Sequence, residues 1–345
     1  MNTINKEFIK DKVLLVTGGT GSFGKNFVNT ALREYQPRKI IIFSRDELKQ
    51  YEMSHQYNAD DMEIIRFFIG DVRDRERLYR ALDGVDIVVH AAALKQVPAC
   101  EYNPIEAVKT NILGAANIID AAIDRGVEKV VALSTDKAAN PINLYGATKL
   151  CSDKLFVAAN AYSGAHKTKF SVVRYGNVLG SRGSVIPLFR RLKESGRIPI
   201  TDRRMTRFWI TLKQGVNFVF RSLEVMQGGE IYVPKIPSSD IEMVAQVIAP
   251  GCEIEEIGIR PGEKLHEVLI SKDDARNSLE FEDRYAILPS WVTVDIDKYQ
   301  AKVGGTPCRP DFEYSSDANP ETLDEDGLKR LIETADAESQ ALATR

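Results

Sequence analysis

The feature that most restricts the fold is a glycine cluster that directly follows a short apolar run. Residues 12–16 read KVLLV, and the next eight residues are TGGTGSFG. Glycines at positions 18, 21 and 24 have the spacing G-x-x-G-x-x-G, which permits a tight turn and brings the amides of a helix N-terminus close to a pyrophosphate. Taken alone, the cluster also fits a glycine-rich turn without a ligand. Its position between a strand and a helix favours a dinucleotide-binding loop.

Five more short apolar runs follow, separated by longer segments. They cover residues 39–43, 64–69, 86–90, 129–133 and 170–175. Runs this short and β-branched are typical of strands buried on both faces of a parallel sheet. The segments between them, such as 111–125, are long enough for crossover helices. We therefore predict an α/β protein with a doubly wound (Rossmann) parallel sheet.

The pattern changes after about residue 175, where glycines, prolines and arginines separate shorter elements. This change predicts a smaller α/β lobe that covers the ligand and is interleaved with late elements of the sheet. The end of the chain is acidic and has few large apolar residues, which is typical of a frayed terminus. The predicted divisions are a dinucleotide-binding domain (1–176, with later elements returning to it), an interleaved substrate lobe (177–330) and a flexible tail (331–345).

Charge and cysteine content exclude several function classes. The net charge of -3 argues against a general nucleic-acid or membrane-surface binder. The four cysteines lie far apart and form no CxxC pair, which favours reduced thiols over a disulfide framework or a metal site. The first residues are polar, and no apolar run reaches the ~20 residues of a membrane span. We expect a soluble cytoplasmic protein without metal, nucleic-acid or membrane partners.

The residues after the second predicted strand bear on the choice of dinucleotide. An acidic residue there usually binds the ribose 2′-hydroxyl of NAD. Here Ser44 and Arg45 come first, and an arginine fork with a hydroxyl donor suits the 2′-phosphate of NADP. Asp46 leaves NAD open as the alternative. We predict NADP, with Lys49 nearby and with Asp71 accepting from the adenine amine.

A tyrosine and a lysine four residues apart form the predicted catalytic centre. Tyr145 and Lys149 share one face of a helix that follows the fifth strand. A lysine ammonium lowers the pKa of a nearby tyrosine, so Tyr145 is predicted to act as a base near neutral pH. The alternative is a surface lysine beside a half-buried tyrosine. Thr135 at the strand end and the upstream glycine loop favour the catalytic interpretation.

Several long motifs carry a resemblance to a known family. TGGTGSFG, GDVRD, HAAALKQVP, STDK and YGATK resemble the extended short-chain dehydrogenase/reductase superfamily across residues 10–290. Dehydratases of that superfamily usually have Thr-Asp-Glu at the strand end, whereas this chain has Lys137 at the third position. Together with RYGNVLGSRGSVIPLF, ITDRRMTRFWI and IGIRPGEKLHE, this lysine makes the chain similar to the inverting UDP-N-acetylglucosamine 4,6-dehydratases of pseudaminic acid synthesis.

The resemblance implies a reaction. Tyr145 takes the proton of the sugar 4-hydroxyl while hydride passes to the nicotinamide, and Thr135 and Lys149 assist. Lys137 is the expected C5 base, on the expectation that burial and Lys149 lower its pKa. Asp136 is the expected acid for the 6-hydroxyl. Ion pairing for Lys137 and helix capping for Asp136 are the alternatives. The NADP is expected to be tightly bound and regenerated in each cycle, and the resemblance implies a homo-oligomer, namely a hexamer.

The remaining predicted contacts fall into two sets. Residues expected at the cofactor are Gly18, Thr20, Gly21, Ser22, Phe23, Gly24, Ser44, Arg45, Asp46, Lys49, Asp71, Val72, Ala91, Ala92, Ala93, Lys95, Asn111, Ser134, Tyr145, Lys149 and Tyr175. Residues expected at the UDP-sugar are Lys95, Asn177, Val178, Arg182, Val185, Thr201, Met205, Arg207, Arg260 and Glu263. Arg207 and Arg260 are expected at the diphosphate, Thr201 and Met205 at the uracil, and Glu263 at the ribose or paired with Arg260.

Three other functions fit parts of this pattern. A UDP-sugar 4-epimerase uses the same tyrosine and lysine but has no need for the Asp136–Lys137 pair. A retaining dehydratase differs only in the configuration at C5. A non-catalytic NADP-binding scaffold would not need the catalytic residues at all. Loss of water from the substrate separates the dehydratases from the other two.

Overall fold

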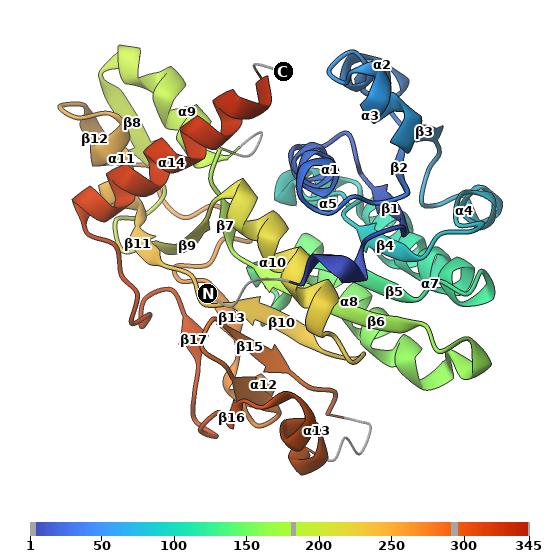
Figure 1. Ribbon diagram of the computed structural model, residues 1–345. Coiled ribbons are helices and arrows are strands. Elements are labelled where there is room, and N and C mark those ends of the chain that lie inside the picture. Colours follow the sequence, from blue (N-terminus) through green and yellow to red (C-terminus); the bar gives the residue numbers. More distant parts are fainter. Residues whose placement is uncertain (1–4, 181–183, 291–295, 344–345) are drawn as a thin grey trace.

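The protein is described by a computed structural model that covers residues 5–180, 184–290 and 296–343. A ten-stranded sheet forms its centre (Figure 1). Its strands are β1 (Val13–Thr17), β2 (Lys39–Ser44), β3 (Ile65–Ile69), β4 (Ile87–His90), β5 (Lys129–Thr135), β6 (Lys169–Tyr175), β10 (Ile231–Pro234), β14 (Ser278–Glu280), β15 (Arg284–Ile287) and β16 (Thr306–Pro307). The six strands predicted from the sequence are the first six of these.

The strand order is β16-β14-β15-β10-β6-β5-β4-β1-β2-β3. Neighbouring strands pair in parallel from β3 through β2, β1, β4, β5 and β6 to β10. Strands β15, β14 and β16 add an antiparallel edge. The order reverses between β1 and β4, and ligands of doubly wound sheets bind at that switch point. The predicted fold class is confirmed, and strands from the second half of the chain return to the sheet.

Helices and short turns connect the strands. The helices are α1 (Ser22–Glu34), α2 (Glu47–Ser54), α3 (Ala59–Ile64), α4 (Arg75–Ala81), α5 (Val97–Tyr102), α6 (Pro104–Val108), α7 (Gly114–Asp124), α8 (Leu144–Tyr162), α9 (Val185–Leu192), α10 (Leu212–Val225), α11 (Ile241–Ile248), α12 (Lys272–Ala275), α13 (Ile296–Val303) and α14 (Glu325–Ala343). The short turns are η1 (Lys6–Phe8), η2 (Lys109–Leu113), η3 (Asp136–Ala138), η4 (Gly164–His166) and η5 (Lys193–Ser195).

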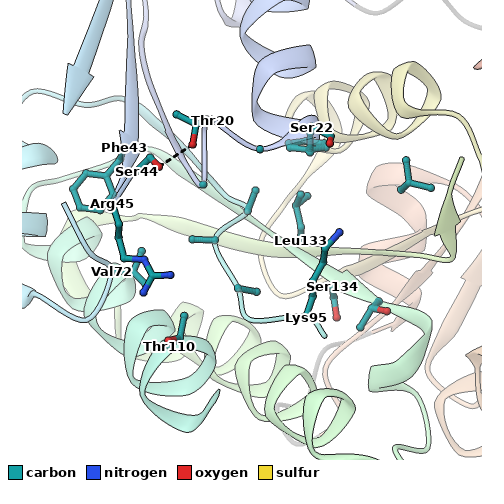
Figure 2. A pocket seen from close by; sticks show the side chains of 18 of the residues that line it. Thr20, Ser22, Phe43, Ser44, Arg45, Val72, Lys95, Thr110, Leu133 and Ser134 are labelled. Carbon is teal, nitrogen blue, oxygen red and sulfur yellow. Dashed lines mark hydrogen bonds between the residues drawn. The ribbon is translucent and has the colours of Figure 1, made fainter. Parts of the chain in front are cut away.

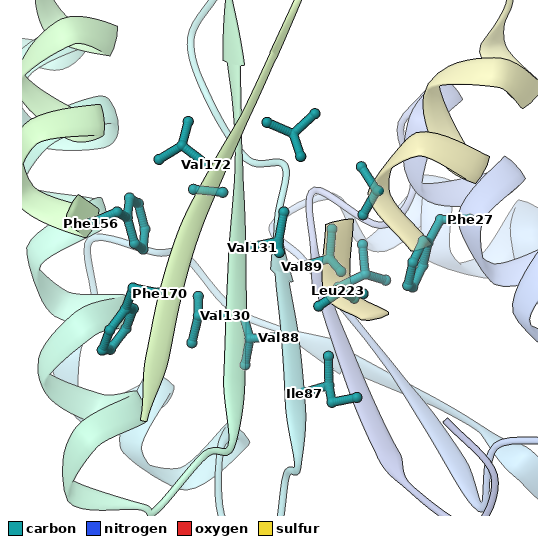
Figure 3. Close-up of a cluster of buried hydrophobic side chains, with 14 of the residues drawn as sticks. Phe27, Ile87, Val88, Val89, Val130, Val131, Phe156, Phe170, Val172 and Leu223 are labelled. Atoms are coloured by element: carbon teal, nitrogen blue, oxygen red, sulfur yellow. The ribbon is translucent and has the colours of Figure 1, made fainter. Parts of the chain in front are cut away.

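Apolar side chains fill both faces of the parallel strands. Figure 3 shows Phe156 of α8 on one side of these strands and Phe27 and Leu223, from α1 and α10, on the other. All three side chains are fully buried. Strand β3 departs from the prediction of burial on both faces, because Ile69 is exposed. As the edge strand, β3 has a neighbour on one side only.

A second, smaller core lies in the C-terminal lobe. It is surrounded by α9, α11 and α14, with a three-stranded sheet of β7 (Asn177–Val178), β9 (Thr206–Ile210) and β11 (Ser238–Asp240). Two further pairs join β8 (Arg197–Ile200) to β12 (Glu253–Glu256) and β13 (Val268–Ile270) to β17 (Tyr314–Ser315). This core is separate from the one around the large sheet.

The prediction of a flexible tail at 331–345 is wrong for the described part of that segment. Residues 325–343 form α14, which lies against the C-terminal lobe in Figure 1. Its Leu328, Ile332 and Ala335 are buried in the second core. Spacings of three and four residues place these side chains on one helix face, so few apolar residues suffice to dock the helix. Within the described ranges, no helix is long and apolar enough to cross a membrane.

Candidate active site

The glycine loop forms a tight turn between β1 and α1. Gly18 has a φ of +65°, and a Cβ atom there would lie 3.1 Å from the backbone of Ala92. Helix α1 begins after Gly21, which has no side chain to cap it, so the first amides of α1 face a ligand unobstructed. Gly24 lies behind the loop, against the backbone of Gly19, and does not line the cavity. This geometry provides an anion site at the switch point of the sheet.

A cavity of about 570 Å³ extends from this loop along the carboxyl ends of the strands. Figure 2 shows Thr20, Ser22, Arg45, Lys95 and Ser134 around it. All predicted cofactor residues line this cavity except Gly24 and Asn111. The cavity also includes residues that were not predicted, namely Phe43, Gly70, Thr110, Leu133, Gly176 and Leu212. Most of them directly adjoin predicted residues, whereas Leu212 begins α10 and has no local motif to mark it.

The end of β2 presents a hydroxyl and a cation to the cavity. Ser44 Oγ lies 2.9 Å from Thr20 Oγ1, as the dashed line in Figure 2 marks. Arg45 is half exposed, and its Nη1 lies 3.5 Å from Asp71 Oδ2. The Asp46 carboxylate caps α2 by accepting from the Lys49 amide and from Lys49 Nζ. These hydrogen bonds lower the pKa of Asp46, so the carboxylate is charged and already paired.

Helix α8 carries three functional side chains on one face. Tyr145, Lys149 and Asp153 follow one another at intervals of four residues. Asn143 caps the helix by accepting from the Gly146 amide at 2.8 Å. The buried Asp153 accepts from Ser134 Oγ at 2.7 Å and pairs with the buried Arg174 at 3.3 Å. Asp153 was not predicted from the sequence, although its helical spacing from Lys149 marks the position.

Burial dominates the charge states along this face. Burial raises the pKa of Tyr145 to about 12, while the Lys137 charge and a hydrogen bond with Thr135 act in the opposite direction. The cation that opposes burial is thus Lys137, where Lys149 was expected. Burial also lowers the pKa of Lys149, and Asp153 partly offsets this. The prediction that Tyr145 is a ready base is wrong for the protein without its ligands.

His90 and Asn111 support the site from behind. Burial, and then the Lys149 charge, lower the pKa of His90 to about 3, so its ring is neutral and bonds Thr17 Oγ1 at 2.8 Å. Asn111 lies in the π-helical turn η2. Its amide donates to Leu94 O and to Thr148 Oγ1 and accepts from the Leu94 amide. Asn111 therefore ties the loop after β4 to the catalytic helix, as expected for a bracing side chain.

Turn η3 holds a second polar cluster directly after β5. Asp136 is 1% exposed, and its Oδ1 accepts from Thr135 Oγ1 at 2.8 Å and from Lys137 Nζ at 3.1 Å. Lys137 Nζ also lies 3.2 Å from Oε1 of the buried Glu267. Burial alone would lower the pKa of Lys137, but Asp136 and Glu267 together raise it. The prediction that the pKa of Lys137 is lowered is therefore wrong. It did not include the effect of Glu267, because no sequence pattern indicated this residue.

The predicted substrate residues are distributed unevenly. Lys95 and Val178 line the cavity, and Asn177 adjoins Val178 on β7. Val185 packs beside the second core, and Arg182 lies outside the described residues. Thr201 donates to Met205 Sδ, and Met205 is 1% exposed within the second core. Met205 is thus a core residue in this conformation, contrary to its expected place in a uracil pocket.

The three residues expected at the diphosphate and ribose bond to the protein itself. Arg207 donates to the carbonyl oxygens of Thr206, Leu265 and Lys264 at 2.7–3.0 Å. Its guanidinium fork thus holds the chain at residues 264–265, which corrects its predicted role. Arg260 is exposed and pairs with Glu263, the alternative stated for Glu263. Among the described residues, no group of three His, Cys, Asp or Glu side chains could hold a metal ion.

Known proteins share both the sequence and the fold. Residues 14–289 match the family described as polysaccharide biosynthesis protein. The chain is 56% identical to the UDP-N-acetylglucosamine 4,6-dehydratase (inverting) of Campylobacter jejuni, over 93% of this chain and 97% of the relative. It is 44% identical to the UDP-glucose 4-epimerase of Rickettsia conorii, over 80% and 83% of the two chains.

Two solved structures share the fold. Pen from Bacillus thuringiensis has a TM-score of 0.85 and 37% identity, over 95% of this chain and 99% of the other. The dTDP-glucose 4,6-dehydratase DesIV from Streptomyces venezuelae, solved with NAD and TYD bound, has a TM-score of 0.67 and 22% identity, over 93% and 96%. At that identity, DesIV shows a shared fold.

Proposed function

Because this chain belongs to the polysaccharide biosynthesis protein family, we propose that it acts on a nucleotide sugar as a UDP-N-acetylglucosamine 4,6-dehydratase that inverts C5. The product is UDP-2-acetamido-2,6-dideoxy-β-L-arabino-hex-4-ulose. The relative that supports this proposal is the inverting dehydratase that is 56% identical over most of both chains. The observation that carries the proposal is that two groups of side chains meet at the end of β5. Thr135, Tyr145 and Lys149 line the cavity, and the Asp136–Lys137 pair adjoins them.

The first step is oxidation at C4. A nicotinamide held in the cavity would supply hydride chemistry at C4 and at C6. Tyr145 takes the proton of the 4-hydroxyl, Thr135 bonds the same oxygen, and Lys149 stabilises the tyrosinate. The buried Lys149 charge, held by Asp153, lies on the same helix face as Tyr145.

The second step is loss of water across C5 and C6. Lys137 Nζ lies 3.1 Å from Asp136 Oδ1, so one proton can pass between them. Its transfer leaves an amine on Lys137 and a carboxylic acid on Asp136. The amine removes the C5 proton, and the acid protonates the leaving 6-hydroxyl as water. The lysine is then an ammonium again and the aspartate a carboxylate, so the pair is restored. Inversion requires that the proton which C5 then receives arrives on the face opposite Lys137.

The cofactor that these residues favour is NADP. Asp46, the residue that would bind an NAD ribose, is occupied by the cap of α2 and by Lys49. Arg45 and Ser44 remain at the cavity for a 2′-phosphate. The 570 Å³ cavity and the free amides of α1 would hold the rest of the dinucleotide. Identifying the dinucleotide released on denaturation tests this choice.

The biological setting follows from the same resemblance. We place the protein in the cytoplasm as a homo-oligomer, and we place its reaction at the start of pseudaminic acid or related surface-glycan synthesis. The motifs around HAAALKQVP and IGIRPGEK support this assignment. A cofactor held in the cavity would be regenerated in each cycle, because the hydride removed from C4 returns to C6.

Proton NMR of the enzyme with UDP-N-acetylglucosamine in heavy water tests the proposed function. We expect a new 6-methyl signal, deuterium at C5 and the couplings of the L-arabino product. A D-xylo product would support a dehydratase that retains the configuration at C5 and would contradict inversion. Conversion to UDP-N-acetylgalactosamine without loss of water would favour the 4-epimerase, the activity named for the Rickettsia conorii relative. Bound NADP with unchanged substrate would contradict both activities and favour a scaffold.

A further inference from the structure

One buried carboxylate contacts the elimination pair from a distant part of the chain. Glu267 directly precedes β13 and is 2% exposed. Its Oε1 lies 3.2 Å from Lys137 Nζ and 3.9 Å from Arg207 Nε. Its Oε2 is buried and has no hydrogen-bond partner among the described residues. Lys137 therefore lies between two carboxylates, one from its own turn and one from the C-terminal lobe.

The backbone of Glu267 is fixed by β17. The Glu267 amide donates to Ser316 Oγ at 2.9 Å, and the Ser316 amide donates to Glu267 O at 2.9 Å. Ser316 Oγ also lies 2.6 Å from Thr206 Oγ1. These bonds fix the backbone of Glu267, and its carboxylate is placed by its contacts with Lys137 and Arg207. A carboxylate placed this rigidly suits a role in setting the position of another side chain.

The segment around Glu267 contacts the corner between η3 and α8 at two more points. Asn143 Nδ2 donates to Gly262 O at 2.8 Å, and Lys264 Nζ donates to Ala139 O at 2.6 Å. Gly146 allows the corner itself to close, because a Cβ atom there would lie 2.2 Å from Lys137 O. Residues 262–267 of the C-terminal lobe therefore dock onto the turn that carries Asp136 and Lys137.

We propose that Glu267 is a positioning residue for the elimination step, which holds the Lys137 ammonium against Asp136 and keeps it charged until the sugar is oxidised. This inference rests on the proposed function. The oxidation residues, Thr135, Tyr145 and Lys149, all lie on β5 and α8. Only the elimination pair needs a residue of the C-terminal lobe. Glu267 consequently acts directly on water loss, and it reaches C4 oxidation only through the Lys137 charge, which opposes the raising of the Tyr145 pKa.

The direct test measures the titration of Lys137 in the whole protein without substrate. Acetylation of Lys137 by acetic anhydride is followed by mass spectrometry across a pH series, in the wild type and in Glu267→Gln. Loss of one neighbouring carboxylate should lower the titration midpoint of Lys137 by about one to three pH units. Glu280→Gln removes the carboxylate of another lysine pair, with Lys235, and should leave Lys137 unchanged. A Lys137 midpoint equal to that of the wild type in Glu267→Gln would overturn the proposal.

A kinetic test uses the two phases of nicotinamide absorbance in a single turnover. In Glu267→Gln the rise, which reports C4 oxidation, should stay within about threefold of wild type. At alkaline pH the decay should slow in the variant but not in the wild type. The rate of decay should fall at least about tenfold for each unit by which the pKa of Lys137 is lowered. An equal loss in both phases would mean a merely structural role and contradict the proposal.

A conservative variant and a comparison with the wild type distinguish failure of this proposal from failure of the proposed function. Glu267→Asp retains the charge, so it should recover part of the decay rate, and it serves as the test variant if Glu267→Gln does not fold. If the wild type does not reduce nicotinamide with UDP-N-acetylglucosamine, the proposed function fails. The acetylation midpoint then still decides whether Glu267 sets the charge of Lys137.

Discussion

Two lysines of this site have opposite charge environments, although they lie close together in sequence. Lys149, on α8, is 3% exposed, and burial lowers its pKa against the opposition of Asp153. Lys137, on η3, has two carboxylates within 3.2 Å, which raise its pKa. The difference is one of number, because Lys149 has the single carboxylate of Asp153, which Arg174 and Ser134 share, whereas Lys137 has the two carboxylates of Asp136 and Glu267.

This comparison separates the site into an oxidation region and an elimination region. The oxidation region consists of Tyr145, Lys149 and Asp153, on one helix face. The elimination region consists of Asp136, Lys137 and Glu267, from two lobes. An ammonium that needs to stay charged beside a tyrosine can rely on one shared carboxylate. A lysine that exchanges its proton with a neighbouring carboxylate is instead held between two carboxylates.

The largest expected effect is that of Tyr145→Phe in the oxidation region. Removal of the base for the 4-hydroxyl should slow nicotinamide reduction by about 10⁴-fold, at the upper end of general base contributions. Water loss should stop as well, because the C5 proton becomes acidic only beside the 4-ketone. Rapid mixing with UDP-N-acetylglucosamine measures both. Tyr162→Phe, at the exposed end of the same helix, is the control, and normal reduction in Tyr145→Phe would contradict the assignment.

A smaller and more selective effect is expected for Lys137→Met. Nicotinamide reduction should continue, although more slowly, because the Lys137 charge no longer opposes the raising of the Tyr145 pKa. Water loss should fall by about 10³-fold. Reduced nicotinamide should then accumulate together with a 4-keto sugar that still carries its 6-hydroxyl. Absorbance and mass spectrometry detect the two species. The exposed Lys154→Met is the matched control. Loss of both steps in Lys137→Met would remove the division into two regions.

The smallest expected effect is that of Asp153→Asn on pH dependence. Asp153 opposes the lowering of the Lys149 pKa and contributes to the raising of the Tyr145 pKa. Its neutralisation should therefore lower both values and move the whole pH profile of C4 oxidation down by about one unit, with about a tenfold loss at the alkaline end. Asp120→Asn, an exposed carboxylate on α7, should leave the profile unchanged. An upward movement would show that Asp153 does not control these charges.

Much of the fold could be predicted because its signals are local. The first six parallel strands are continuous apolar runs, and the glycine loop follows the first of them directly. The family inferred from the motifs is confirmed by the match over residues 14–289 and by the relatives of high identity. The α14 helix was missed because an amphipathic helix with three buried residues resembles a polar tail in composition.

The residues of the site could likewise be predicted where their sequence signals are local. Residues next to the glycine loop, at the end of β2 and on the first turns of α8 line the cavity, as their motifs indicated. Arg207 and Met205 were misplaced because both are typical of ligand sites, and nothing local shows that Arg207 bonds carbonyls or that Met205 joins a core. Phe43 and Gly70 adjoin predicted positions, so a wider window would have included them.

The sequence by itself determined which residues have the chemistry, because helix and strand periodicities fix the relation of Tyr145 to Lys149 and of the glycine loop to α1. The tertiary structure alone decided the charge of Lys137. Its pKa depends on Glu267, which reaches it only after residues 262–267 have docked on the corner between η3 and α8. Electrostatic interactions depend on distance in space and on burial, and neither is encoded in the spacing of residues along the chain.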